Sequence, residues 1–217
     1  MIKEAIKRQS FKEYSKAVTI AYIMRPVKDT PEILRSWDIL NRHNQRMFDI
    51  LQSKVKVEWT SDDPYKTAQE MREKVKKSGI IYINTDYSSN LPSGWSEEDN
   101  WKFRTVHDFI VHIGGKVDFT QKGEIQAFNV HAKIVPPAAL DALFSEVVAQ
   151  AAYATTMNDF PKQQKACKLY GFDYKNIGNI DYDEYRKNFT VNPKKEIDKK
   201  LIDRIITSVQ TKNLNNK

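Results

Sequence analysis

The histidines of this chain are concentrated in one stretch. Three of the four, His107, His112 and His131, lie close together in the middle of the chain, interleaved with Asp108 and Glu124. Imidazole nitrogens and carboxylate oxygens bind divalent metals, and the same groups transfer protons in general acid–base catalysis. Burying several ionisable groups together costs free energy unless they pair, bind a metal or react. This stretch is therefore the candidate functional site.

Three helices are expected to carry these side chains, over residues 97–114, 123–134 and 138–157. Ser96 precedes a first turn of acidic residues, which is typical of a helix N-terminus. Paired glycines follow the first helix and paired prolines follow the second, and both are typical helix ends. The third segment is rich in alanine, so it can approach its neighbours closely. The sequence thus predicts a centre of three packed helices.

The spacing within the first helix limits which side chains can meet. Arg104, Asp108 and His112 follow one another at four-residue intervals and share one stripe of an ideal helix, so that Asp108 and His112 could bind one ion. His107 lies about 100° away from Asp108 on the same helical wheel. An undistorted helix cannot direct all three at one atom, so at least one of them is expected to orient the others or to face a different helix.

The site residues are assigned roles from these positions. We expect His107, Glu124 and Glu146 to approach one another in a single polar pocket between the three helices. The metal ligands are expected to be His107, His112 and His131, the catalytic residues Asp108, Glu124 and Glu146, and the other binding residues Arg104 and Gln150. A divalent metal is a possible cofactor.

The other segments predict a mainly α fold of the α+β class, a helical bundle core with a small two-strand element. Thr30 before Pro31 is typical of a helix start, and the short strand patterns KVKVEWT and IIYINTD flank a helical segment that ends at Gly79. The two strands could form a βαβ unit or a hairpin. The expected organisation is N-terminal helices (1–54), a core with the histidine and acid cluster (55–175) and a basic C-terminal helix and tail (176–217), within one compact domain.

Composition excludes several classes of protein. The single cysteine, Cys167, excludes an intramolecular disulfide and a multi-thiolate zinc site, and suits a reducing cytoplasm. No apolar run is long enough to span a membrane, and the charged N-terminus predicts no export signal. The net charge is +7, and the densest lysines lie on a predicted amphipathic helix near the C-terminus. No recognition motif accompanies these lysines, so weak nucleic-acid binding at most is expected.

The same residues resemble a family of bacteriophage proteins that also occurs as a domain of large phage polyvalent proteins. The likeness runs over about residues 62–174 and follows the pattern Phe-Arg-x-Val-His-Asp-x3-His, then a Phe, a Gly-Glu pair, a His, and an acid-x3-Gln helix. The sequence departs from the pattern at Ile113 to Gly115 and at Ala149. The family is uncharacterised, so the resemblance implies a phage origin, a location in the host cytoplasm or the virion, and a polar site, but no reaction.

A second, weaker resemblance concerns TVHDFIVHIGGK, which looks like the His-Asp helix of HD-domain metal-dependent phosphohydrolases. In that family an upstream histidine, the His-Asp pair and a later aspartate hold metal in a helical bundle. The resemblance implies that His43 could supply the upstream histidine, together with His107 and Asp108. No residue here is assigned to the later aspartate.

Three functions remain open from the sequence. The first is a metal- or ligand-binding helical enzyme, hydrolytic in its chemistry. The second is a phage structural or accessory protein that binds phage or host proteins, in which the polar cluster is a packing network. The third is a basic protein that associates with nucleic acid through its terminal helices. The substrate and the oligomeric state are not encoded in any recognisable motif.

Overall fold

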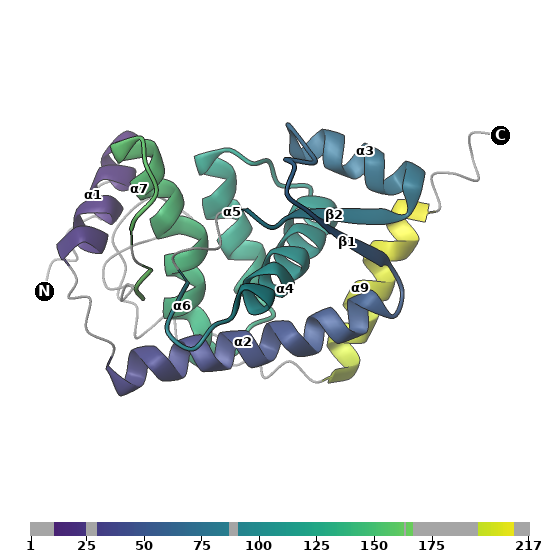
Figure 1. Cartoon of the computed structure of the whole chain (residues 1–217), viewed down its shortest axis with the longest axis horizontal. Coiled ribbons are helices and arrows are strands. Elements are labelled where there is room, and N and C mark those ends of the chain that lie inside the picture. Colours follow the sequence, from purple (N-terminus) through teal and green to yellow (C-terminus); the bar gives the residue numbers. More distant parts are fainter. Residues whose placement is uncertain (1–10, 25–29, 87–90, 163, 167–194, 211–217) are drawn as a thin grey trace, which may run out of the picture.

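The fold is described from a computed structural model that covers residues 11–24, 30–86, 91–162, 164–166 and 195–210 (Figure 1). The elements are, in order, α1 (Phe11–Met24), α2 (Pro31–Gln52), β1 (Lys56–Thr60), α3 (Ala68–Ser78), β2 (Ile80–Asn84), α4 (Glu97–His107), η1 (Asp108–Gly114), α5 (Gln121–His131), η2 (Pro137–Ala139), α6 (Leu140–Phe144), η3 (Ser145–Ala149), α7 (Gln150–Met157) and α9 (Lys195–Gln210). The mainly α fold with a small two-strand element, expected from the sequence, is confirmed.

The two strands form a parallel pair. Lys56 of β1 is opposite Ile80 of β2, and Thr60 is opposite Asn84. Parallel strands need a crossover rather than a tight turn, and α3 supplies it, so the βαβ alternative holds and the hairpin does not. As expected from the sequence, α3 ends at Gly79, which adopts the left-handed conformation with φ of 71°. The sheet packs beside α4 and thereby fixes the start of the site helix.

The long helix α2 supports the other elements along the length of the molecule (Figure 1). The side chain of Thr30 accepts a hydrogen bond from the backbone N–H of Ile33, and Pro31 occupies the first turn, as the sequence indicated. The buried residues of α2 recur at helical spacing and form the face on which α4, α6 and α9 pack; they include Trp37, Leu40, Met47 and Leu51. Amphipathic spacing thus positions the helices that carry the site.

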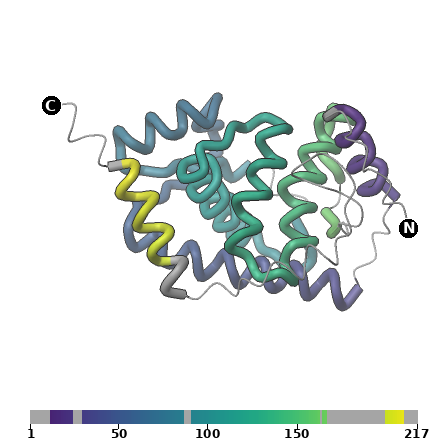
Figure 2. The backbone as a smooth tube through the Cα atoms, turned by 180° about the vertical axis from the view of Figure 1, so that it is seen from behind, coloured from purple at the N-terminus to yellow at the C-terminus, as the bar shows by residue number. Residues whose placement is uncertain are grey.

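Packed helices form the two ends of the molecule. Helices α1 and α7 pack side by side at one end, and α9 lies beside α2 and α3 at the other (Figures 1 and 2). The amphipathic C-terminal helix expected from the sequence is confirmed over Lys195–Gln210, with Ile202 and Ile205 buried. None of the helices in the described ranges is long and apolar enough to cross a membrane.

One hydrophobic cluster joins residues from most of the chain. It includes Tyr14 of α1, Trp37 of α2, Ile81 of β2, Phe144 of α6 and Ile205 of α9. The subdivision near residues 54 and 175 stays a prediction, and the second boundary lies outside the described residues.

The site helices keep most of their expected bounds but not their expected winding. The first expected helix divides into α4 and the π-helix η1, and the third divides into the 3-10 helix η2, then α6, the π-helix η3 and α7. Ser96 caps α4 in a capping box with Asp99, which confirms the predicted start. The middle helix begins two residues earlier than expected because Thr120 caps it by accepting from the backbone N–H of Gly123.

Candidate metal centre

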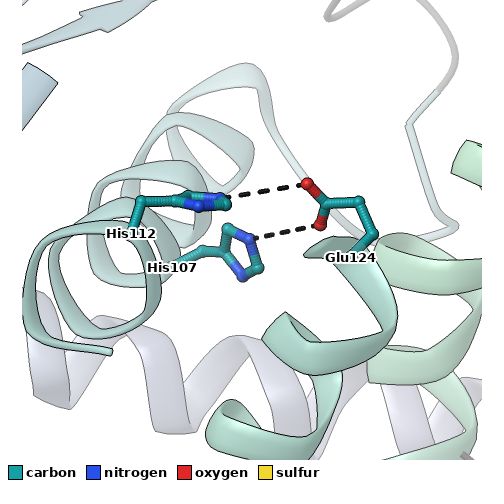
Figure 3. A group of neighbouring side chains, drawn as sticks. All are labelled: His107, His112 and Glu124. Atoms are coloured by element: carbon teal, nitrogen blue, oxygen red, sulfur yellow. Dashed lines mark ion pairs between the residues drawn. The ribbon is translucent and has the colours of Figure 1, made fainter. Parts of the chain in front are cut away.

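Three side chains converge at the junction of α4, η1 and α5 (Figure 3). The Nε2 atom of His107 lies 3.7 Å from Oε2 of Glu124, and the Nε2 atom of His112 lies 3.9 Å from Oε1 of the same carboxylate. One ligand atom from each residue lies within 4.8 Å of the other two. Both imidazoles are buried and the carboxylate is half-buried. The group has the composition and spacing of a three-ligand metal site.

The π-helix brings the two histidines together. In an ideal α-helix, residues five apart point about 140° away from each other. A π-helix makes hydrogen bonds over five residues, so His107 and His112 come onto one side when the winding changes at Asp108. The two ring centroids are 5.0 Å apart. The π winding therefore brings His107 and His112 onto one side, which a regular α-helix would not do.

The hydrogen bond of His112 fixes its tautomer. Its Nδ1 atom lies 3.0 Å from the carbonyl oxygen of Val117. Because a carbonyl only accepts, Nδ1 carries the hydrogen, and in the neutral ring Nε2 presents its lone pair to Glu124. Burial lowers the pKa of His112 to about 4, assisted by the charge of His107, so the ring is neutral at pH 7. Two acceptors, an imidazole nitrogen and a carboxylate oxygen, thus face each other.

His107 is held from its other side by His131. The two Nδ1 atoms are 3.4 Å apart, and both rings stack on Phe103. His131 is fully buried, and burial, followed by the charges of His107 and His43, keeps its pKa well below the ordinary value. Burial opposes protonation of His107 as well, but the carboxyl groups of Glu124, Asp108 and Glu146 together outweigh it and the pKa of His107 is raised. His107 therefore donates from Nδ1, and His131 accepts.

A cavity of about 380 Å³ adjoins the cluster. His107, Glu124 and Glu146 all line it, so the predicted single pocket between the three helices is confirmed. Arg104 and Gln150 line it too, and Gln150 donates from Nε2 to Oε2 of Glu146 over 2.7 Å. The residues expected to bind ligand therefore share one cavity with the cluster.

Two half-buried carboxyl groups hold protons more tightly than usual. Burial raises the pKa of Glu146 to about 7, although Arg104, the hydrogen bond from Gln150 and the charge of His107 oppose the rise. Burial likewise raises the pKa of Asp108 to about 6, with a further contribution from the charge of Glu124. Glu146 can therefore exchange a proton near neutral pH, which is the property of a general acid or base.

Three expected residues lie beside the ligand group rather than in it. Asp108 lies beside His112, with its Oδ1 atom 3.9 Å from Nε2 of that ring. His131 contacts His107 through Nδ1, in the position of a residue that orients a ligand. His43, the upstream histidine implied by the HD-domain resemblance, lies 3.2 Å from Arg46 through its Nδ1 atom and is not a member of the group.

Sequence reasoning missed Gln121, which lines the cavity as the first residue of α5. Its position three residues before Glu124 places it on the same helix face, and the capping role of Thr120 would have revealed that the helix begins there. The carbonyl of Val117, which fixes His112, carried no signal because any residue type provides a carbonyl.

Comparison of the chain with protein-family models, with curated proteins and with solved structures found no match. The resemblance to the bacteriophage family stays a prediction, and the role of the cluster rests on its geometry.

Proposed function

We propose that His107, His112 and Glu124 bind a divalent transition-metal ion and that the protein is a metal-dependent hydrolase. The observation that carries this proposal is the pair of facing acceptors, the lone pair of His112 Nε2 and the carboxylate of Glu124, held 3.9 Å apart. The lone pair of the buried His112 and the half-buried carboxylate repel each other unless a proton or a cation lies between them.

The dimensions suit such an ion. Bonds of about 2.1 Å in tetrahedral geometry separate neighbouring ligand atoms by roughly 3.4 Å. The separations of 3.7 and 3.9 Å, which join the two imidazoles to different oxygens of Glu124, exceed this value by a few tenths of an ångström, and the three ligand atoms all lie within 4.8 Å of one another. Two imidazoles and one carboxylate favour zinc, iron, cobalt or manganese over magnesium or calcium. Three protein ligands leave a further position for water, as in catalytic rather than structural zinc sites.

Glu146 supplies the proton transfer in this proposal. A metal held by His107, His112 and Glu124 would supply a nucleophile at neutral pH by lowering the pKa of a water to about 7. The carboxylate of Glu146, whose pKa is also about 7, accepts the proton of the attacking water and returns it to the leaving group. The water oxygen forms the new bond as the substrate bond breaks, so no oxidant or reductant is needed.

Metal binding is the first test. Protein purified without an affinity tag is analysed for bound metal, and the apoprotein is titrated with zinc and with manganese. We expect one ion per chain, and for Glu124→Gln an affinity more than about 100-fold weaker, since changes at residues that merely orient ligands already reach that range. The matched control is Glu98→Gln, which changes an exposed glutamate on α4 that pairs with Lys102.

Two results would refute the proposal. One is a wild-type protein that binds neither metal stoichiometrically. The other is His112→Ala that loses helical content together with metal, because the cluster would then be a packing network, as in the non-catalytic phage accessory protein. We expect this variant to keep its circular dichroism spectrum while losing the ion, and Glu146→Gln to keep the ion while losing turnover.

A further inference from the structure

Arg104 presents one edge of its guanidinium group for a ligand. Its Nη1 atom donates to the carbonyl oxygens of Asn84 and Asp86, each over 2.9 Å. These two bonds anchor the side chain to the end of β2 and its following residues. Within the described part of the chain the other donors, Nε and Nη2, have no hydrogen-bond partner, and the side chain lines the cavity. That edge is a two-pronged donor that matches the oxygens of a carboxylate or a phosphoryl group.

Gln121 adds a second donor to the same cavity. Its Nε2 atom is shielded from solvent and has no hydrogen-bond partner among the described residues. Leaving a buried amide N–H without an acceptor costs free energy, so such a donor in a native structure calls for an explanation. An acceptor brought by a ligand provides one. Two anchored sets of donors thus line a cavity that adjoins the cluster.

The mouth of the cavity is apolar. Phe119 and Phe160 line it and keep 39% and 59% of their surfaces exposed, respectively. Phe119 also makes an edge contact with the ring of His112, with centroids 4.6 Å apart. Exposed aromatic side chains at a cavity mouth pack well against an apolar or aromatic part of a ligand.

We propose that the substrate is an apolar or aromatic molecule bearing an oxyanion group, a carboxylate or a phosphoryl, which binds the free edge of Arg104 and the amide of Gln121 beside the metal. This inference rests on the proposed metal site. The carboxyl groups of Glu124 and Glu146 line the cavity and repel an anion, whereas Arg104, the one arginine or lysine among the described lining residues, attracts it. A bound divalent ion would add positive charge beside the cavity and so favour the anion. Binding of the oxyanion therefore depends on the metal, and by linkage the oxyanion tightens metal binding by the same factor.

The test uses the full chain with its metal content measured before each titration. Benzoate and phenylphosphonate are the carboxylate and phosphoryl probes, and benzamide is the neutral probe of the same shape. We expect one of the two anions to bind the metal-loaded protein at least about 10-fold more tightly than benzamide, and the preferred anion identifies the group. The same anion should bind the metal-free protein at least about 10-fold more weakly.

Two substitutions locate the site. Arg104→Gln and Gln121→Glu should each weaken the anion at least about 10-fold, while the affinity for metal changes by less than about 3-fold. Arg42→Gln and Gln69→Glu, on exposed faces of α2 and α3, are the matched controls and should change neither affinity. Because Arg104 also donates to two backbone carbonyls, thermal unfolding checks whether its variant stays folded. Gln121→Glu tests the anion site without disturbing those bonds.

The outcomes separate this inference from the proposed function. A protein that fails to bind metal refutes both. Full metal occupancy with anions no tighter than benzamide, or with anion binding unaffected by both substitutions, refutes the oxyanion site and leaves the metal centre intact.

Discussion

Replacing His131 with phenylalanine tests how the ring of His107 is oriented. In the native protein His107 donates from Nδ1 to Nδ1 of His131, which leaves Nε2 directed at Glu124 for the metal. Phenylalanine keeps a ring that can stack on Phe103 but offers no acceptor. His107 then favours the tautomer with its hydrogen on Nε2, where Glu124 accepts it. A metal can bind only after that hydrogen has moved to a nitrogen with no partner.

The magnitude follows from the lost hydrogen bond. A buried donor left without its acceptor costs about 1–3 kcal/mol, which corresponds to roughly 5- to 150-fold in metal affinity. Measured losses for residues that orient metal ligands fall in the same range, at about 10- to 100-fold. The unfolding free energy of the apoprotein should change by less than about 1 kcal/mol, because the substitution also removes the buried Nε2 of His131, which has no hydrogen-bond partner in the described part of the chain.

The assay is competition for zinc against a chromophoric chelator, paired with denaturant unfolding of the apoprotein. Nitrogen NMR of the imidazoles reports which nitrogen of His107 carries the hydrogen. His131→Asn is the control, since its Oδ1 atom replaces the Nδ1 acceptor, and it should keep metal affinity within about 5-fold of wild type. Metal affinity unchanged in His131→Phe, or lost equally in both variants, would refute the orienting role of His131.

Four further predictions concern charge and packing. The pKa of His107 is raised, so its proton competes with the ion, and metal affinity should fall about tenfold per pH unit below that pKa, with proton release visible by calorimetry in different buffers. In the metal-free protein the carboxyl of Glu146 should titrate near pH 7 by carbon NMR, and a value near 4.5 would contradict its burial. Gly114→Val should destabilise the fold by about 1–3 kcal/mol in denaturant melts, because a Cβ there would lie 2.6 Å from Cδ1 of Ile205; unchanged stability would contradict that contact. Nucleic-acid binding should be weak, and tight binding at physiological salt that vanishes on deletion of residues 193–217 would overturn this expectation.

Local signals in the sequence predicted much of the scaffold. The cap at Ser96, the left-handed turn at Gly79 and the proline at the start of α2 each depend on a few neighbouring residues, so they are readable without the fold. The convergence of Glu124 and Glu146 on one cavity followed from amphipathic helices that must bury their faces together.

The residues that form the ligand group were harder to predict from the sequence. Helical periodicity favoured Asp108 with His112, because an ideal wheel places residues four apart on one stripe. In the structure His107, not Asp108, joins His112 in the ligand group, because the helix changes to π winding at Asp108. The spacing of apolar residues does not show whether a helix has α or π hydrogen bonds. The contact between His131 and His107 could not be predicted from the sequence, because it depends on how α5 packs against α4 through long-range contacts.

The π-helix also makes the site sensitive to chain length. A π turn contains about one residue more than an α turn, so removing a single residue from Asp108–Gly114 would let the segment continue as a regular α-helix. A deletion between His107 and His112 would leave the two histidines four residues apart, on one stripe of that α-helix, whereas α winding without a deletion would point them about 140° away from each other. Point substitutions that preserve apolar character at Val111 or Ile113 leave the residue count intact. Within this helix, the pairing of the two histidines therefore depends on the match between the residue count and the winding.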